Sequence, residues 1–235
     1  MSDFRVPYCQ ENYRLVFSDK QLLVVDKPAG LLSVPGRHPN NQDSLIGRVQ
    51  RHYPEARIVH RLDMATSGLM LMARDADTHR QLSKLFERRQ IQKRYLAVVA
   101  GTTALQGSIG VPLICDWPRR PRQKVDWQNG KKALTRFRRL HSESGQSTVV
   151  LEPVTGRSHQ LRLHMAHIRH PILGCEFYAP DTVRRRANRL LLHATQLGFT
   201  HPASGEWLTL DSPAPFSNAS LTPLTDRAHD RTASV

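Results

Sequence analysis

Residues 60–73 read His-Arg-Leu-Asp-Met-Ala-Thr-Ser-Gly-Leu-Met-Leu-Met-Ala, a polar segment followed by an apolar run. The run at 69–73 predicts a buried strand. Asp63 therefore lies where a loop meets a strand end, a place that a rigid scaffold can hold while the side chain stays open to a ligand. Thr66 to Gly68 supply hydroxyl groups and backbone donors for a tight turn. Two structural roles remain open beside a catalytic one: Asp63 could pair with Arg61, or it could cap that turn.

The segments around this stretch alternate between strand-like and helix-like patterns. Strands are predicted at 15–17, 22–25, 95–100, 134–140, 148–153, 190–199 and 207–210. One helix, capped by Asp43 or Ser44, is predicted to run to about His52. Asp75 or Asp77 caps a second helix with apolar residues three and four apart, and 158–168 predicts a third. Together these elements indicate an α+β fold with a largely antiparallel sheet.

The sequence has no internal repeat and no linker that would divide it, which predicts one domain over residues 14–215. A short extension, residues 1–13, precedes the first strand. Residues 216–235 are rich in Ser, Thr, Ala and Asp and predict a disordered tail.

The composition is that of a folded protein with a basic surface. Of 235 residues 39% are hydrophobic, and the formal net charge is +14, with 27 arginines among the 34 basic residues. Arginine grips phosphate in two-point contacts and stacks on bases, so the arginine bias favours a nucleic-acid partner. A GC-rich genome would also raise the arginine content.

The apolar runs are too short to cross a bilayer. Three widely separated cysteines suggest reduced thiols, and no secretory signal is visible, so we expect a cytoplasmic protein.

Two basic clusters are candidates for RNA binding. The first, in the proline-rich stretch 117–124, contains Arg119, Arg120, Arg122 and Lys124, and its prolines predict an exposed loop or arm. The second contains Arg184, Arg185 and Arg186. Such surfaces attract phosphates, although either cluster could also be an ordinary solvated loop.

A second chemistry-bearing segment, residues 151–162, places Arg157 at the entrance of the predicted third helix. Arg162, five residues later, cannot share a helix face with it, so the two arginines are expected to have different tasks. An arginine beside Asp63 would lower the pKa of that carboxyl and keep it ionised.

Metal and kinase interpretations are not favoured. The histidines at 164, 167 and 170 drift around an ideal helix, and no carboxylate or cysteine pattern accompanies them. Residues 60–63 are similar to the protein-kinase catalytic loop, but an extra leucine separates Arg61 from Asp63. No asparagine lies five residues after Asp63, and no glycine-rich loop precedes it. We therefore expect neither a metal nor a cofactor.

Several ordered blocks resemble the RluA family of pseudouridine synthases, over roughly residues 14–215. The blocks are Asp26-Lys27-Pro28-Ala29-Gly30, His60-Arg61-Leu62-Asp63, Lys93-Arg94-Tyr95, Gly156 to Arg162, His170 to Gly174 and Leu191 to Ala194. Residues 112–118 and 123–125 narrow the resemblance to a branch that modifies both large-subunit ribosomal RNA and a tRNA anticodon stem-loop. The N-terminal S4 domain of many relatives is not expected here. Cys175 stands where the family usually has Asp, which puts a local loop contact in doubt.

The resemblance implies a mixed, largely antiparallel central sheet flanked by helices, with a catalytic cleft at its centre. It implies that Asp63 is the catalytic carboxylate, that Tyr95 packs against the target base, and that Arg157 pairs with Asp63. Arg61 resembles the side chain that fills the gap left by the flipped base. The implied reaction is isomerisation of uridines in 23S ribosomal RNA and a tRNA stem-loop. Apart from the resemblance, one domain without a coiled-coil repeat predicts a monomer. A non-catalytic basic RNA-binding protein on the same fold is the alternative, and a metal-dependent RNA hydrolase using the histidines is a third.

Overall fold

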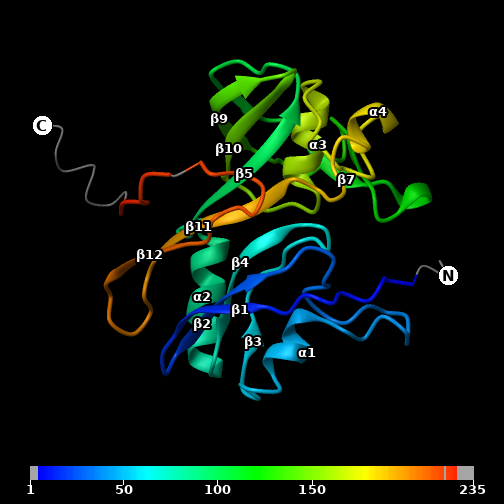
Figure 1. The fold of residues 1–235 in the computed structure, drawn as a ribbon. Coiled ribbons are helices and arrows are strands. Elements are labelled where there is room, and N and C mark those ends of the chain that lie inside the picture. The colour runs from blue at the N-terminus through cyan, green and yellow to red at the C-terminus, as the bar shows by residue number, and fades with distance from the viewer. Residues whose placement is uncertain (1–4, 220, 227–235) are drawn as a thin grey trace, which may run out of the picture. The chain divides into compact units, whose positions relative to one another are not determined.

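The computed structural model describes residues 5–219 and 221–226 (Figure 1). The chain forms two compact units, one of residues 1–93 and 194–235 and the other of residues 94–193. We call them the first and the second unit and describe each by itself. In the described part of the chain, no helix has the length and apolar character needed to span a membrane.

The sheet of the first unit is built around β4 (Ser67–Ala73), whose seven residues are all buried. β1 (Arg14–Ser18) and β2 (Leu22–Lys27) form the predicted hairpin, and β2 pairs antiparallel with β4. β3 (Arg57–Ile58) also pairs with β4. β11 (Leu192–Thr200) follows β4 in the strand order and pairs antiparallel with β12 (Trp207–Asp211). A run of apolar residues buried on both faces explains why β4 occupies the centre of this sheet.

Two helices of the first unit begin at side-chain caps that the sequence predicted. Asp75 accepts a hydrogen bond from the Thr78 backbone N–H at 2.8 Å and starts α2 (Ala76–Glu87). Leu82 of α2 is fully buried in the core of this unit, a burial worth about 1.5–3 kcal/mol. Ser44 caps α1 (Leu45–Val49), which ends at Val49 and is thus shorter than the predicted helix to His52.

The second unit contains a sheet in the order β5-β10-β9-β6, antiparallel throughout. Its strands are β5 (Gln92–Ala100), β10 (Gln146–Pro153), β9 (Thr135–Glu143) and β6 (Gln106–Ile109). α3 (Gln160–His167) packs against one face of β9 and β10 (Figure 1). The predicted α+β class with a mostly antiparallel sheet is confirmed.

Some elements differ from the sequence-based expectation. The stretch 117–124, predicted as an exposed loop or arm, is the exposed end of a hairpin between β7 (Leu113–Cys115) and β8 (Gln123–Val125), with an unpredicted short 3-10 helix, η1 (Trp117–Arg119), at the turn. Arg184 ends a short helix, α4 (Asp181–Arg184), that was not predicted. α3 begins at Gln160 and not at Ser158, because His159 adopts a left-handed conformation with φ of 53°. β6, β7 and β8 are too short to show a periodic pattern in the sequence.

The expected disordered tail, residues 216–235, is only partly covered, since residues 220 and 227–235 lie outside the described residues. Within the described part, Leu224 is 4% exposed. Its carbonyl accepts hydrogen bonds from Trp207 Nε1 at 3.2 Å and Thr209 Oγ1 at 2.7 Å. This segment therefore packs against β12.

Candidate active site

Asp63 lies in the first unit, in the loop that leads into β4. Its side chain is partly exposed, and its carbonyl accepts a hydrogen bond from the Thr66 backbone N–H at 3.1 Å, which closes the predicted turn. Gly68 completes the turn with φ of +114°, and a Cβ there would lie 2.3 Å from the Ala194 carbonyl oxygen. Only glycine fits this conformation and this close approach of β11, so the strand end behind Asp63 is fixed.

A fully buried cation, Lys27, holds the residues that follow Asp63 in the chain. Its Nζ donates hydrogen bonds to the carbonyls of Pro28 and Leu31 at 2.8 Å each and of Met64 at 3.1 Å. The Gly30 backbone N–H donates to the same Met64 carbonyl at 2.8 Å. An ammonium group is buried without large cost only when its protons are hydrogen-bonded, and Lys27 meets this condition with carbonyls of two loops. It therefore ties residues 28–31 to the residue after Asp63.

The residue before Asp63 is held as firmly. The Leu62 carbonyl accepts a hydrogen bond from Ser33 Oγ at 2.7 Å, and the Leu62 backbone N–H donates to the same hydroxyl at 3.2 Å. Ser33 is 5% exposed. Asp63 is thus bracketed by anchored neighbours on both sides, while the residue itself is partly exposed.

His60 anchors the start of the same loop as a neutral imidazole. Its Nε2 accepts a hydrogen bond from the Leu71 backbone N–H at 2.9 Å, and its ring packs on Phe86 with centroids 4.6 Å apart. Desolvation, followed by the positive charge of Lys93, lowers the pKa of His60 to about 3. Desolvation also lowers the pKa of Lys93. A protonated ring could not accept the Leu71 bond, so the neutral state and the loop position support each other.

Arg61, two residues before Asp63, is exposed. Among the described residues, its guanidinium makes no hydrogen bond and no ion pair. Its side chain is therefore free to reorient when a ligand arrives.

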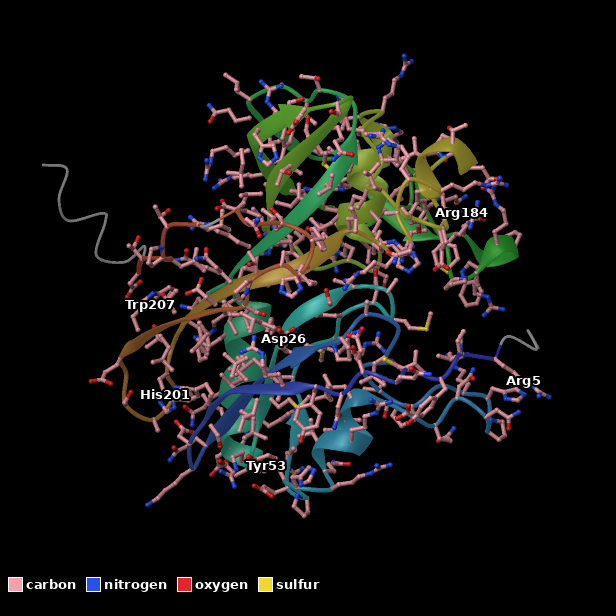
Figure 2. All side chains as sticks on the ribbon, in the orientation of Figure 1. Arg5, Asp26, Tyr53, Arg184, His201 and Trp207 are labelled. Carbon is pink, nitrogen blue, oxygen red and sulfur yellow. The ribbon has the colours of Figure 1, made fainter. Side chains whose placement is uncertain are left out.

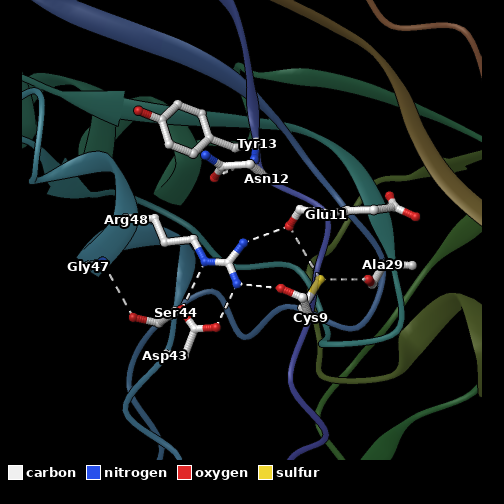
Figure 3. A network of polar contacts seen from close by, with 9 residues as sticks. All are labelled: Cys9, Glu11, Asn12, Tyr13, Ala29, Asp43, Ser44, Gly47 and Arg48. Carbon is white, nitrogen blue, oxygen red and sulfur yellow. Dashed lines mark hydrogen bonds and ion pairs between the residues drawn. The ribbon is translucent and has the colours of Figure 1, made fainter.

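The N-terminal segment is tied to the same region through Arg48 (Figure 3). Arg48 donates to the carbonyls of Cys9 and Glu11 at 2.6 Å each, and it forms an ion pair with Asp43 at 2.6 Å. The hydrogen bonds from Arg48 hold the pKa of the Asp43 carboxyl below its usual range. Cys9 Sγ lies 3.5 Å from the carbonyl of Ala29, in the loop that Lys27 braces. Residues 9–11 are therefore held against α1 by Arg48 and against the loop at residues 28–31 by Cys9.

In the second unit, Tyr95 projects from the sheet face that carries α3. Tyr95 lies opposite Leu151, and Leu151 lies opposite Phe137, so the three side chains share one face. Thr135, two residues before Phe137, faces α3, because its hydroxyl bonds Gln160 Nε2 at 3.0 Å and His164 Nδ1 at 2.9 Å. The α3 side of the sheet thus presents the tyrosine that sequence analysis selected.

Arg157 lies at the same end of this sheet, between the end of β10 and the start of α3. Its Nε donates to the Lys132 carbonyl at 3.3 Å, and its backbone N–H donates to Gln160 Oε1 at 3.0 Å. Gln160, which is 3% exposed, also accepts from Thr155 Oγ1 at 2.7 Å and donates to the Leu134 carbonyl at 3.0 Å. Gln160 therefore fixes the conformation of the loop that carries Arg157. Gln160 belongs to the sequence motif 156–162, but no role was predicted for it.

Arg162 has a different environment from Arg157, as predicted. It is 2% exposed, its Nε lies 3.4 Å from Cys175 Sγ, and its guanidinium lies over the Phe177 ring at 4.9 Å. The cysteine that replaces the usual family aspartate is thus a direct neighbour of Arg162. The substitution therefore bears on the surroundings of Arg162.

The basic cluster on the β7–β8 hairpin combines charge with an exposed aromatic ring. Trp117 is 66% exposed, and the Arg120 guanidinium lies 4.4 Å from the centre of its ring. Arg119 pairs with Asp116 at 2.7 Å, Arg122 lies over Phe177 at 5.9 Å, and Lys124 lies 3.5 Å from Asp126.

The second basic cluster is on and after α4. Arg184, labelled in Figure 2, pairs with Asp181 at 3.0 Å. Arg186 donates to Gln146 Oε1 at 2.9 Å. Arg185 is exposed. These contacts leave the cluster as a surface feature of the second unit.

Two of the three histidines considered as metal ligands, His164 and His170, have structural partners. Both ring nitrogens of His164 are engaged, Nδ1 with Thr135 Oγ1 at 2.9 Å and Nε2 with the Val111 carbonyl at 3.2 Å. His170 Nδ1 lies 2.8 Å from the Ala100 carbonyl. Between residues 5 and 226, apart from residue 220, no group of three or more His, Cys, Asp or Glu is placed to hold a metal ion.

The candidate residues thus fall into two groups. Asp63 and Arg61 share one braced loop of the first unit, and Tyr95 and Arg157 lie at one end of the second unit's sheet. The pairing of Arg157 with Asp63 stays a prediction.

Comparison with known proteins agrees with this arrangement of motifs. A family model described as RNA pseudouridylate synthase matches residues 21–167. The dual-specificity RNA pseudouridine synthase RluA of Escherichia coli (strain K12) is 48% identical over 86% of this chain and 93% of its own length. RluA of Yersinia pestis is 50% identical over 81% of this chain and 94% of its own.

Solved structures show the same relationship. Human RNA pseudouridylate synthase domain containing 1 has 26% identity and a TM-score of 0.73 and covers 97% of this chain and 96% of that protein. Human RNA pseudouridylate synthase domain containing 4 has 26% identity and a TM-score of 0.69, over 86% of this chain and 88% of that protein. The predicted family, enzyme class and narrower resemblance to RluA are confirmed. The chain belongs to the RluA family of RNA pseudouridine synthases.

Proposed function

We propose that this enzyme isomerises specific uridines in 23S ribosomal RNA and in a tRNA anticodon stem-loop, with Asp63 as the catalytic carboxylate. The name of the curated relatives, dual-specificity RNA pseudouridine synthase, supports more than one RNA substrate. The observation that carries the role of Asp63 is its setting. It is a partly exposed carboxylate whose neighbours are held by the buried side chains of Lys27 and Ser33.

The reaction needs a well-positioned acid group and an extracted base. The bond from ribose C1′ to uracil N1 breaks and a bond from C1′ to C5 forms, while C5 loses a proton and N1 gains one. Substrate and product are therefore isomers. An ionised Asp63 can act as nucleophile at the sugar or the base, or assist glycosidic cleavage and proton removal. Arg157, if paired with it, keeps it ionised.

The remaining site residues, Tyr95 and Arg61, are assigned to the extraction of the target base from the RNA. Removing a uridine from its stack costs a few kcal/mol, and least when it already lies in a loop. Stacking on the Tyr95 ring returns about 1–3 kcal/mol. Arg61, exposed and without a partner among the described residues, fills the gap left in the RNA.

Phosphate contacts offset the rest of the cost. We assign them to the two basic clusters of the second unit, Arg119, Arg120, Arg122 and Lys124 on the β7–β8 hairpin and Arg184, Arg185 and Arg186 at α4. We further propose that the enzyme acts as a cytoplasmic monomer.

The test is pseudouridine mapping on 23S ribosomal RNA and tRNA transcripts with Asp63→Asn and Asp63→Ala. Both variants should lose isomerisation and keep the far-UV circular dichroism spectrum and the RNA affinity of the wild type. Asp77→Asn, which changes an exposed carboxylate on α2, is the matched control and should be fully active. Wild-type turnover by Asp63→Ala would refute the assignment.

A further inference from the structure

A surface pocket of about 390 Å³ lies on the second unit's sheet, over β6, β9 and β10. Arg136 and Arg138 of β9 line it. Thr135 faces α3, and side chains alternate along a strand, so both arginines project from the opposite face. The pocket therefore lies on the other side of the sheet from Tyr95.

The edge strand places a polar side chain beside each arginine. In the antiparallel register, Ser108 lies opposite Arg136 and Gln106 lies opposite Arg138. Directly opposite residues point to the same face, so a hydroxyl and a carboxamide flank the two guanidinium groups. The pocket thus gathers hydrogen-bond donors suited to phosphate oxygens.

The charge of this face is not neutralised by the protein. Arg136 and Arg138 are exposed, and within the described part of the chain neither guanidinium forms an ion pair or hydrogen bond. Glu152 is opposite Arg136 on β10, but its Oε1 lies 2.7 Å from Nε of Arg94. Three arginines and one carboxylate leave two positive charges on this face.

The close approach of β6 to β9 beneath the pocket depends on a glycine. A Cβ at Gly107 would lie 2.7 Å from the Phe137 ring, so any larger residue would push β6 away from β9 or displace the ring. Gly107 therefore lets β6 approach β9 closely, with the Phe137 ring on the α3 face and the two arginines on the pocket face. The donors are therefore mounted on paired strands and not on a loop.

We propose that this pocket binds the phosphodiester backbone of the RNA substrate, at a part of the RNA outside the target loop. The inference rests on the proposed RNA substrates, and charge complementarity selects the occupant. A strand rises about 3.3 Å per residue, so the two arginines are spaced about 6.6 Å along β9 and can contact separate phosphates. RNA that places its uridine on the Tyr95 side reaches the pocket around β6, the edge strand of this sheet, three of whose four residues are exposed.

The experiment compares Arg136→Ala/Arg138→Ala with the wild type on two RNAs, a minimal anticodon stem-loop and a long 23S transcript, by measuring Kd against KCl concentration. Two lost phosphate contacts lower the slope of log K against log salt by about 1.4–1.8 for the long RNA. Raising KCl from 50 to 200 mM should then weaken wild-type binding about 7- to 12-fold more than binding by the double variant. The stem-loop should bind both proteins with the same slope.

Two control variants distinguish the loss of this site from a general loss of positive charge. Arg80→Ala removes an exposed arginine of α2 and should leave both slopes unchanged, and Arg136→Lys/Arg138→Lys should retain most of the wild-type slope. An unchanged slope for the double alanine variant on the long RNA, in protein with a wild-type Tm, would overturn the proposal. So would an equal loss on both RNAs. Because the experiment measures binding, its result tests this pocket even if Asp63 proves not to be the catalytic residue.

Discussion

Replacing Lys27 by methionine tests whether the braced loop is what positions Asp63. The substitution keeps the apolar stem and removes an ammonium that donates three hydrogen bonds, to the carbonyls of Pro28, Leu31 and Met64. Hydrogen bonds to charged groups contribute about 1.5–3 kcal/mol each, so the gross loss is about 5–9 kcal/mol. The variant no longer buries a charge, which returns several kcal/mol. We expect the free energy of unfolding to fall by about 3–5 kcal/mol.

Urea unfolding followed by circular dichroism measures this change. With an m value of about 1–3 kcal/mol/M, the midpoint should fall by roughly 1–5 M. Lys20→Met, at an exposed position of the β1–β2 turn, is the control and should change the free energy of unfolding by less than about 0.5 kcal/mol. Because a 1 Å displacement of a catalytic group can cost about 10²-fold in rate, kcat should fall about that much in folded Lys27→Met, with little change in KM.

Two results would refute the reasoning for Lys27. An unfolding midpoint equal to that of the wild type would mean that the three carbonyls find other partners at no cost. A full loss of stability with unchanged kcat in the folded fraction would mean that Lys27 holds the fold without positioning Asp63.

Three further predictions follow from the site and its surroundings. Tyr95→Phe should keep RNA affinity, because the ring remains, whereas Tyr95→Ala should weaken it by about 1–3 kcal/mol; equal binding by both variants would remove Tyr95 from the stacking role. Gln160→Ala leaves the Arg157 loop without its buried partner and should lower both kcat and the free energy of unfolding, the latter by about 1–3 kcal/mol; wild-type values of both would show that the loop holds itself. Desolvation lowers the pKa of His164 to about 4, so the unfolded chain binds one more proton than the folded protein between pH 6.5 and 4. Stability should therefore fall as the pH drops through this window, with about 3 kcal/mol of the fall due to His164. In His164→Asn the urea midpoint should fall less over the same range, and the remaining fall comes from groups such as His60.

Local patterns in the sequence were enough to predict much of the secondary structure. The apolar run at 69–73 became the centre of a sheet, and Asp75 and Ser44 cap the helices that they were expected to cap. These features depend on residues close together in the chain, where period and capping chemistry leave a direct trace. The ordered motifs also identified the family and selected Asp63, Tyr95 and Arg157.

The residues that brace the site were not predictable in the same way. Lys27 looks like a surface lysine in the sequence, yet it is fully buried because a carbonyl 37 residues away, that of Met64, completes its hydrogen bonds. Ser33 and Leu62 are 29 residues apart. Burial, followed by the positive charge of Lys93, lowers the pKa of His60, whose ring packs on Phe86.

The sequence by itself determined the fold class, the family and the identity of the candidate catalytic acid, because these depend on local periodicity and on ordered motifs. Only the tertiary structure decided which carbonyls surround Lys27, which partners bind the ring nitrogens of His164 and which side chain of β6 lies beside Arg136. The physical reason is that burial, hydrogen-bond satisfaction and strand register are set by partners far apart in the chain, whose meeting leaves no pattern in either segment alone.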